Sequence, residues 1–451
     1  MNVHAPEANF LQTLFNTLNN AGIHYSVMRN HEPLPHSAGG SDLDILVSPD
    51  DAARVRTVVF DAIHAAGGVA IGIAESVGFF KVYALGQSSD VGGAWWGLCL
   101  DINVGLYFHG HKLLDESSEW PSKIHNEIKV LDGGFAGMLG VLKEVLNNSE
   151  LPDRYLVAAR KAANADWSST EVLLAPMGRP AIARFRRLLL EGALADGLKT
   201  ECQSLREEIF GHARSQNHLG ALLARGNYGW SKYRRYMHPS GIVVAILGVD
   251  GAGKSTVIDA ILPALNAATH NAVVVKHLRP TVLPPLARLK GKRSVAEGPV
   301  LDPHGSTPSG WFASILRLAY LTADYILGYW LWTRPRIAKQ PTVVLFDRYA
   351  YDMALDPRRF RIGLPGRVAG WFAALVPKPD IIFCLHGEPA VIAARKQELS
   401  EEETRRQVEA LREFARTEPR AALISTDTSI EDTRDQVLQT LMRSLVSKAG
   451  R

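Results

Sequence analysis

The chain has 451 residues, which is more than one hydrophobic core supports, so two or three domains are expected. Charged residues make up 21% and hydrophobic residues 46% of the sequence, which is ordinary for a soluble globular protein. The net charge of +4 is a mild imbalance and gives no reason to expect a nucleic-acid partner. The three cysteines are far apart and fit no zinc-binding spacing, which favours a reduced, cytoplasmic setting.

The first predicted elements are a helix and a short strand. Apolar residues recur at helical spacing through residues 8–22, and Gly22 closes the pattern. Residues 24–28 then read as a strand. No basic segment followed by an apolar core precedes them, so the sequence predicts no signal peptide.

The next predicted strand, SDLDILV at residues 41–47, carries two carboxylates. Alternate residues of a strand share a face, so Asp42 and Asp44 point the same way while Leu43 and Ile45 enter the core. Two neighbouring carboxylates repel each other unless a positive charge lies between them. A bound Mg²⁺ is the usual solution, so the sequence predicts a metal site here.

Two further strands are predicted at residues 79–85 and 96–106, and the second carries Asp101. A D-h-D strand followed by a third Asp on a later strand resembles the nucleotidyltransferase fold. The resemblance implies a mixed sheet in which Asp42, Asp44 and Asp101 hold metal ions for in-line phosphoryl chemistry.

This resemblance covers about residues 1–110 and departs from the family in one place. Where the family has a Gly-Gly or Gly-Ser pair that holds a triphosphate, this chain has Arg29-Asn30. Three interpretations therefore stay open: an active transferase, a divergent transferase that uses Arg29 for a different phosphate, and an inactive recognition domain. A fourth is that the Asp pair merely caps turns on an unrelated sheet. Lys81 is either a counter-charge for the carboxylates or a solvated strand residue.

Residues 112–237 predict a helical middle segment, because apolar residues recur three and four apart and no strand pattern of any length interrupts them. The stretch His238-Pro239-Ser240-Gly241 is the expected domain boundary. The predicted organisation is a nucleotidyltransferase-like domain at 1–111, a helical linking domain at 112–237, and a third domain at 238–451.

The third domain begins with an apolar strand that breaks into a glycine-rich turn and resumes as a helix. Gly248, Gly253, Lys254 and Ser255 fill the pattern G-x-x-x-x-G-K-[ST] in the strand-to-helix context that a phosphate cradle requires. Glycines let successive backbone N–H groups converge on an anion, and the helix adds its positive N-terminal end. Lys254 is expected to reach the β- and γ-phosphates, and the Ser255 hydroxyl to ligate Mg²⁺.

The rest of this domain alternates strands and helices, as a doubly wound parallel sheet requires. The predicted strands are 242–248, 272–276, 342–346, 380–385 and 421–425. Asp347 and Arg348 directly follow the third of these strands. Because ligands bind beyond the carboxyl ends of parallel strands, both side chains are expected beside Lys254.

This third domain resembles the thymidylate kinase family and the wider group of nucleoside monophosphate kinases. GVDGAGKST at 248–256 matches that family's P-loop, and Asp-Arg-Tyr at 347–349 matches its second motif. KPDIIFCL at 378–385 looks like its fourth strand, and the charged helices of 388–413 look like its lid. The likeness extends over about residues 239–448.

The resemblance implies a kinase that uses ATP and Mg²⁺. Asp250 and Arg348 would contact the acceptor, Lys254 and Arg395 the transferring phosphoryl group, and Asp347 the metal. The residues assigned to ATP are Gly248, Asp250, Gly251, Gly253, Lys254, Ser255 and Thr256.

The span between the second and third strands of this domain is long and carries two distinct patterns. It opens with a basic, proline-rich stretch in which Arg279, Arg288 and Lys290 are candidates to meet an anionic substrate. Residues 311–332 are nearly as apolar as a membrane span. Arg317 and Asp324 make a span costly, so the pattern predicts a helix buried against the sheet, with these residues facing the active site or each other. Docking to a membrane surface is a minority alternative.

These patterns together predict an α/β multidomain phosphotransferase that acts on a phosphorylated small molecule, either a nucleoside monophosphate or a phosphosugar or glycan precursor. A second, nucleotidyltransferase-like activity in the first domain is expected with it. The competing hypothesis is an ATP-gated binding or regulatory module with an inactive N-terminal domain. The sequence leaves the oligomeric state open.

Overall fold

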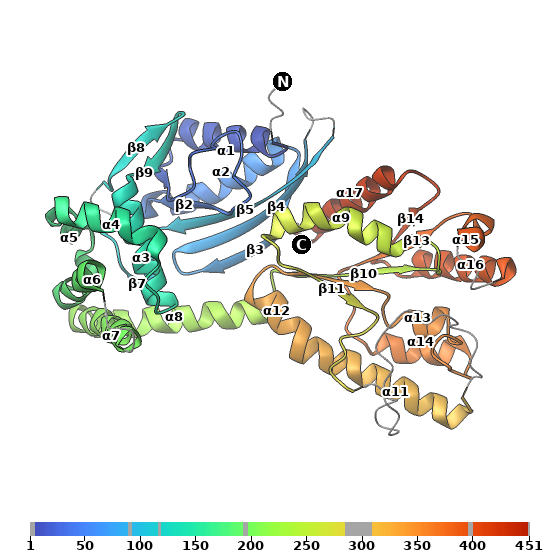
Figure 1. The fold of residues 1–451 in the computed structure, drawn as a ribbon. Helices are drawn as coiled ribbons and strands as arrows, with labels where there is room; N and C mark the ends of the chain where they lie inside the picture. The colour runs from blue at the N-terminus through green and yellow to red at the C-terminus, as the bar shows by residue number, and fades with distance from the viewer. Residues whose placement is uncertain are drawn as a thin grey trace. The chain divides into compact units, whose positions relative to one another are not determined.

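The computed structural model describes residues 5–88, 93–115, 119–192, 197–284, 309–395 and 400–449. The chain is a mixed α/β protein that divides into two compact units, Met1–Arg235 and Tyr236–Arg451 (Figure 1). The first unit contains a mixed sheet and the second a parallel sheet, which confirms both predicted sheet types. Arg288 and Lys290 lie outside the described residues.

The first unit is built on a seven-stranded sheet with the order β3-β4-β5-β2-β1-β9-β8. Its strands are β1 Tyr25–Val27, β2 Leu43–Val47, β3 Gly68–Ser76, β4 Phe79–Gln87, β5 Trp95–Val104, β8 Ser122–His125 and β9 Ile128–Leu131. A separate two-stranded ribbon pairs β6 Tyr107–Phe108 with β7 His111–Lys112. Strands β2 and β5 are parallel neighbours, whereas β4 runs antiparallel to β5.

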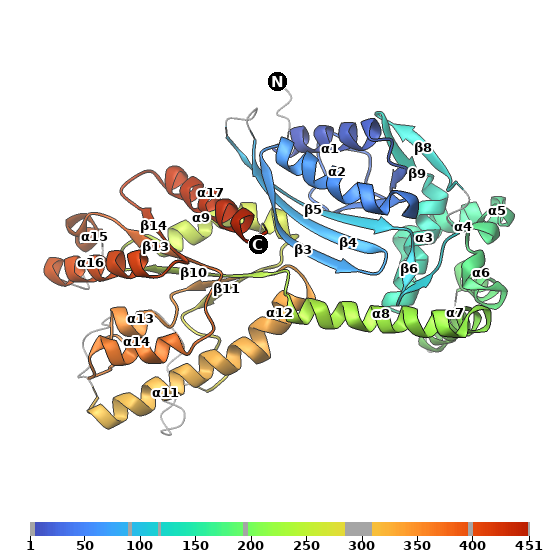
Figure 2. The same cartoon turned by 180° about the vertical axis from the view of Figure 1, so that it is seen from behind.

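Two helices, α1 (Ala8–Asn20) and α2 (Ala52–Ala65), lie side by side on one face of this sheet (Figures 1 and 2). Their apolar stripes pack on the inward residues of β2, so that Leu43 and Ile45 are at most 2% exposed. The alternation of β2 sends Asp44 to the opposite face. The helix pair thus fixes the face to which the carboxylates are turned.

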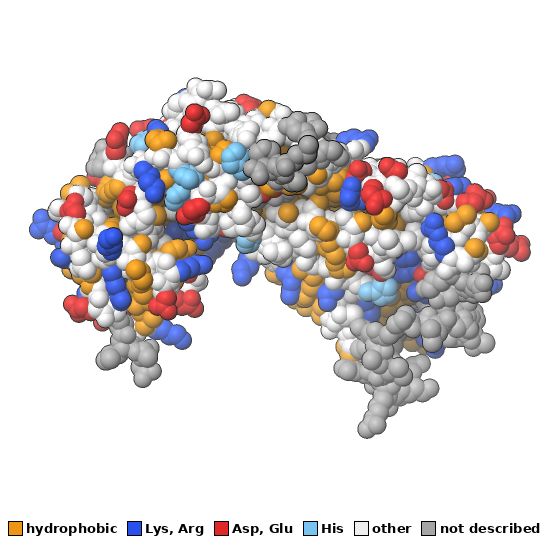
Figure 3. Space-filling view, turned by 45° about the horizontal axis from the view of Figure 1, so that its top comes forward, with side chains coloured by type: hydrophobic (Ala, Val, Ile, Leu, Met, Phe, Trp, Pro, Cys, Tyr) orange, Lys and Arg blue, Asp and Glu red, His pale blue; other side chains and the backbone are white. Residues whose placement is uncertain are grey.

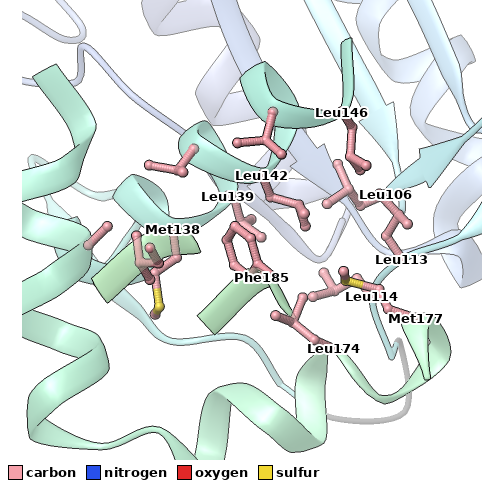
Figure 4. Packing of buried hydrophobic residues seen from close by; sticks show 14 of the residues in the cluster. Leu106, Leu113, Leu114, Met138, Leu139, Leu142, Leu146, Leu174, Met177 and Phe185 are labelled. Carbon is pink, nitrogen blue, oxygen red and sulfur yellow. The ribbon is translucent and has the colours of Figure 1, made fainter. Parts of the chain in front are cut away.

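The second core of this unit lies among the helices of the middle segment and the β6-β7 ribbon (Figure 4). Met138 and Leu142 of α3 pack with Phe185 of α6 and with Leu113 and Met177. The helices are α3 Gly133–Asn147, α4 Asp153–Ala165, α5 Ser168–Leu173, α6 Arg179–Glu191, α7 Leu198–Gln216 and α8 His218–Met237.

The prediction that residues 112–237 contain no strand is wrong for residues 122–131, which form β8 and β9. These strands are four residues each, too short for alternation to stand out in a helical region. β9 pairs in parallel with β1, so this segment completes the sheet of the first unit. The predicted boundary between residues 111 and 112 falls inside β7.

The second unit is built on a five-stranded sheet with the order β11-β12-β10-β13-β14, and every neighbouring pair is parallel. The strands are β10 Ile242–Gly248, β11 Val273–His277, β12 Val343–Asp347, β13 Ile381–His386 and β14 Ala421–Ser425. All five lie within two residues of their predicted positions, because each contains a short apolar run.

Helices cover both faces of this sheet, as a doubly wound fold requires (Figure 1). One face carries α9 (Lys254–Thr269) and α17 (Ile430–Ala449), which pack against each other. The remaining helices of the unit are α11 Trp311–Gly328, α12 Arg334–Lys339, α13 Asp352–Leu355, α14 Gly366–Ala374, α15 Pro389–Arg395 and α16 Glu401–Thr417. A π-helical turn, η3 (Tyr329–Thr333), joins α11 to α12.

The apolar segment 311–332 is only half buried, which corrects the prediction of a helix buried against the sheet. Leu318 and Tyr325 of α11 are buried in the core, but Phe312 and Leu316 are 61% and 56% exposed. Among the described helices, none combines the length and the hydrophobicity needed to cross a membrane.

Candidate active site

The phosphate cradle lies at the carboxyl end of β10, the central strand of the parallel sheet. Gly251 and Gly253 take φ values of +86° and +82°, a left-handed conformation that glycine adopts without a steric penalty. Gly253 is also the N-cap of α9, which begins at Lys254. The glycine-rich turn and the first turn of α9 therefore have the backbone geometry that an anion-binding cradle requires, and the binding of an anion there stays a prediction.

Lys254 lies within this turn and is 8% exposed. Its Nζ donates to the backbone carbonyls of Gly248 and Val249, at 2.9 and 3.0 Å. Burial of the ammonium group and the nearby charge of Arg348 lower the pKa of Lys254 to about 8, against the opposing effect of Asp250. Lys254 is thus a buried cation whose charge depends on pH in the physiological range.

Asp347 ends β12, the strand next to β10, and its Oδ2 accepts a hydrogen bond from His277 Nδ1 at 2.9 Å. Burial raises the pKa of Asp347, but the His277 hydrogen bond and the charge of Lys254 outweigh burial and hold that pKa below its ordinary value. Its other oxygen, Oδ1, is buried and has no hydrogen-bond partner among the described residues.

An ionised carboxylate with an unpartnered, buried oxygen fits a Mg²⁺ ion or one of its water ligands. Ser255 and Thr256 are exposed in the first turn of α9, so their hydroxyls are accessible to a ligand. Asp347 and Ser255 each carry a hard oxygen donor of the kind that Mg²⁺ prefers, and their role as metal ligands stays a prediction.

Asp250 forms ion pairs with two arginines. Its Oδ1 accepts from Arg348 Nη2, and its Oδ2 accepts from Arg359 Nη1. Asp250 Oδ1 also lies 3.8 Å from Lys254 Nζ. Burial raises the pKa of Asp250, but the charges of Arg348, Lys254 and Arg359 prevail and hold it well below its usual range. The carboxylate thus links the cradle lysine to a pair of guanidinium groups.

Arg348 is almost completely buried, at 3% exposure, and its backbone φ of +75° lies in the left-handed region. Its Nη1 donates to Asp352 Oδ1 at 3.1 Å, and Asp352 is itself 3% exposed. Non-glycine residues seldom hold this backbone conformation unless the surroundings impose it, and such residues cluster at functional sites. The turn after β12 therefore directs Arg348 back toward the cradle.

Arg359 is a site residue that the sequence analysis missed. It follows α13 in the stretch DPRRFR at residues 356–361, which has no helical or strand periodicity. The sequence feature that could have indicated Arg359 is the group of arginines in this stretch, which follows closely after the Asp-Arg-Tyr motif.

The structure does not bring the other predicted cations into this cluster. Arg395 is exposed at the end of α15 and has no ion pair with a cradle residue among the described contacts. Arg279 pairs instead with the buried Asp324, at 2.9 Å. Arg317 donates to the carbonyl of Phe360 at 2.8 Å, so Arg317 and Asp324 do not face each other, which was one of the two predicted alternatives.

The carboxylates of the first unit do converge. Asp44 of β2 and Asp101 of β5 are directly opposite in the parallel register. Asp42, Asp44 and Asp101 each offer an oxygen within 4.8 Å of the others. The three predicted ligands therefore form one cluster, on the sheet face away from α1 and α2.

Three cations already neutralise this cluster. Arg29 spans the pair, with Nε donating to Asp44 Oδ2 and Nη2 donating to Asp42 Oδ1 at 2.9 Å. Lys81 lies 2.8 Å from Asp101 Oδ1 and so acts as a counter-charge. Lys143 of α3 lies 3.8 Å from Asp44 Oδ1. Asp44 is only 2% exposed, so its carboxylate is surrounded by these cations rather than by solvent.

Similarity to known proteins is confined to solved structures, since no protein-family model and no curated protein matches the chain. The thymidylate kinase of Ehrlichia chaffeensis is 17% identical with a TM-score of 0.32, and the match covers 45% of this chain and 100% of that one. The thymidylate kinase of Candida albicans is 16% identical with a TM-score of 0.33, and the match covers 45% of this chain and 91% of that one. Both scores are low, so the site assignment rests on the geometry of the cradle.

Proposed function

We propose that the second unit transfers the γ-phosphoryl group of ATP to a phosphorylated small molecule. The observation that carries this proposal is the connected cluster at the end of β10, in which Asp250 joins Lys254 to Arg348 and Arg359. A cradle lysine beside two arginines supplies positive charge on both sides of a transferring phosphoryl group.

Each residue has a distinct task in this proposal. Lys254 neutralises charge that develops on the transferring group, and the backbone N–H groups of residues 251–255 hold the polyphosphate. Ser255 and Asp347 would hold Mg²⁺, which when bound supplies further neutralisation of the phosphate oxygens. Catalysis then comes from positioning and charge rather than from a covalent intermediate.

The acceptor is expected to present a phosphate to Arg348 and Arg359. Arg359 gives one N–H to Asp250, and Arg348 gives one to Asp250 and one to Asp352, so each guanidinium retains N–H donors that suit a second anion. This requirement fits a nucleoside monophosphate, and it fits a phosphosugar or glycan precursor equally well. The test is to incubate purified protein with ATP and a panel of both classes, and to detect the gain of a phosphate by mass spectrometry.

A competing proposal is an ATP-gated binding module, and the neutralised carboxylates of the first unit favour an inactive recognition role for that unit. Arg29, Lys81 and Lys143 leave the cluster without a net negative charge to attract metal ions. A module of this kind would bind ATP but add phosphate to no acceptor in the panel.

Replacement of Arg359 by glutamine is expected to raise the KM for the acceptor by roughly 10- to 100-fold, since a charge-assisted hydrogen bond contributes about 1.5–3 kcal/mol. The KM for ATP should stay unchanged. The matched control is Arg358→Gln, because Arg358 is the exposed neighbour of Arg359. Steady-state kinetics with each substrate varied separately checks this, and an equal rise in both KM values would contradict the acceptor role.

Binding of ATP is expected to weaken as pH rises through about 8, the pKa of Lys254. Above that pH the free protein loses the lysine charge that the phosphates require, so Kd should increase by up to roughly tenfold per pH unit. Calorimetric titrations across this range measure the effect. Lys254→Arg keeps its charge and should show a flat profile, whereas the same bend in both proteins would assign the titration to another group.

A further inference from the structure

The helix α11 has two apolar faces, and only one of them is used by the fold. Leu318 and Tyr325 pack into the core of the second unit, and Tyr325 also donates to the carbonyl of Leu278. On the other side of the helix, Phe312, Leu316 and Leu327 are 61%, 56% and 41% exposed. A helix of a globular unit ordinarily carries polar residues on its outer face.

The exposed apolar surface continues beyond α11. Trp330 and Leu331 of η3 are 50% and 65% exposed. Met237 is a further exposed apolar residue, at 47% exposure. It is held next to this segment by Arg334, whose Nη2 donates to the backbone carbonyl of Met237 at 2.6 Å. We define the α11–η3 face by these six residues: Met237, Phe312, Leu316, Leu327, Trp330 and Leu331.

The exposed charged side chains of the described stretch 309–342, which contains α11 and η3, are basic. Between residues 309 and 342 the only acidic residue is Asp324, which is fully buried and paired with Arg279. Arg336 and Lys339 are exposed, and the Arg336 guanidinium lies 4.2 Å from the centre of the Trp332 ring. Figure 3 shows the molecule turned so that the top of Figure 1 comes forward, and in that view Lys and Arg lie among Asp and Glu.

We propose that the α11–η3 face docks the protein on an anionic membrane surface, with α11 lying in the plane of the headgroups. Trp and Leu side chains on a helix flanked by basic residues suit the boundary between headgroups and acyl chains. Arg336 and Lys339 contribute attraction to anionic lipid. A second copy is a poorer occupant, since a twofold interface would bring identical basic rims together.

The test is flotation of the full chain with vesicles of phosphatidylcholine alone or mixed with phosphatidylglycerol. We expect binding to the mixed vesicles, weakened by salt, and little binding to phosphatidylcholine. Trp330→Ser combined with Leu331→Ser should weaken binding by at least about tenfold. The matched control is Leu423→Ser, because Leu423 is 41% exposed on β14, at the far edge of the sheet from β11.

Circular dichroism and ATP binding of each variant show that it is folded, because neither Trp330 nor Leu331 belongs to the cradle. Failure of the wild-type chain to float with phosphatidylglycerol would overturn the proposal. So would an equal loss in Leu423→Ser. Light scattering that showed a dimer, dissolved by the Trp330 and Leu331 substitutions, would instead assign this face to self-association and would equally overturn it.

Discussion

Replacement of Lys254 by alanine is expected to lower phosphoryl transfer from ATP by roughly 100- to 1000-fold, the usual effect of removing one preorganised group that stabilises transition-state charge. Lys254 is the cation at the centre of the cradle, and its Nζ lies within 3.0 Å of two backbone carbonyls there. Among the described residues, Arg348 is not free to take its place, because it is already paired with Asp250 and Asp352.

The measurement is turnover with whichever acceptor gains phosphate in the panel. Lys339→Ala serves as the control, since Lys339 is an exposed lysine of the same unit. Undiminished turnover in Lys254→Ala would place the reaction elsewhere in the chain and would remove the proposed active site. Wild-type protein that binds ATP without any turnover would instead support the gated binding module.

Replacement of Arg29 by alanine is expected to destabilise the first unit and to make that unit responsive to Mg²⁺. Removing one partner of a buried ion pair costs about 3–5 kcal/mol, and the 33% exposure of the Arg29 side chain lowers our expectation to about 2 kcal/mol. For a unit of this size that is a decrease in Tm of about 4–8 °C. Added Mg²⁺ should restore the loss, because Asp42 and Asp44 then face each other without the guanidinium.

Thermal unfolding without nucleotide, with and without Mg²⁺, measures both effects. Arg56→Ala is the control, because Arg56 pairs with Glu75 at the surface of the same unit, where ion pairs contribute about 0–1 kcal/mol. Stabilisation of the wild-type protein by Mg²⁺, to the same extent as the variant, would show that Arg29 does not exclude the metal. The active-transferase interpretation of the first unit would then be favoured.

The parallel sheet and its cradle were predictable because their signals are local. The strands β10, β12 and β13 of the second unit are buried apolar runs, and the glycines, lysine and serine of the cradle are close together in sequence. Asp347 and Arg348 were placed correctly because parallel strands end at one edge of a sheet. In the first unit, the helix at 8–20 and the carboxylate strand follow from periodicity for the same reason.

The contacts that complete the sites were not predictable in this way. Arg359 meets Asp250 across 109 residues, and Lys143 meets Asp44 across a helix and several strands. Such pairs form only when distant segments pack together, and the periodicity of the sequence does not indicate which distant residues will meet. The same holds for 311–332, where apolar residues surround the helix and only the folded structure distinguishes the packed face from the exposed one.

The turn at Arg348 limits how far this unit can be made heat-tolerant by substitution. A left-handed backbone costs a non-glycine residue about 1–2 kcal/mol, so glycine at this position would relax the chain. The same exchange would strip buried Asp352 of its guanidinium, at a cost of about 3–5 kcal/mol. Selection for thermal tolerance alone is therefore expected to retain arginine here, and laboratory evolution will have to find its gains at other positions.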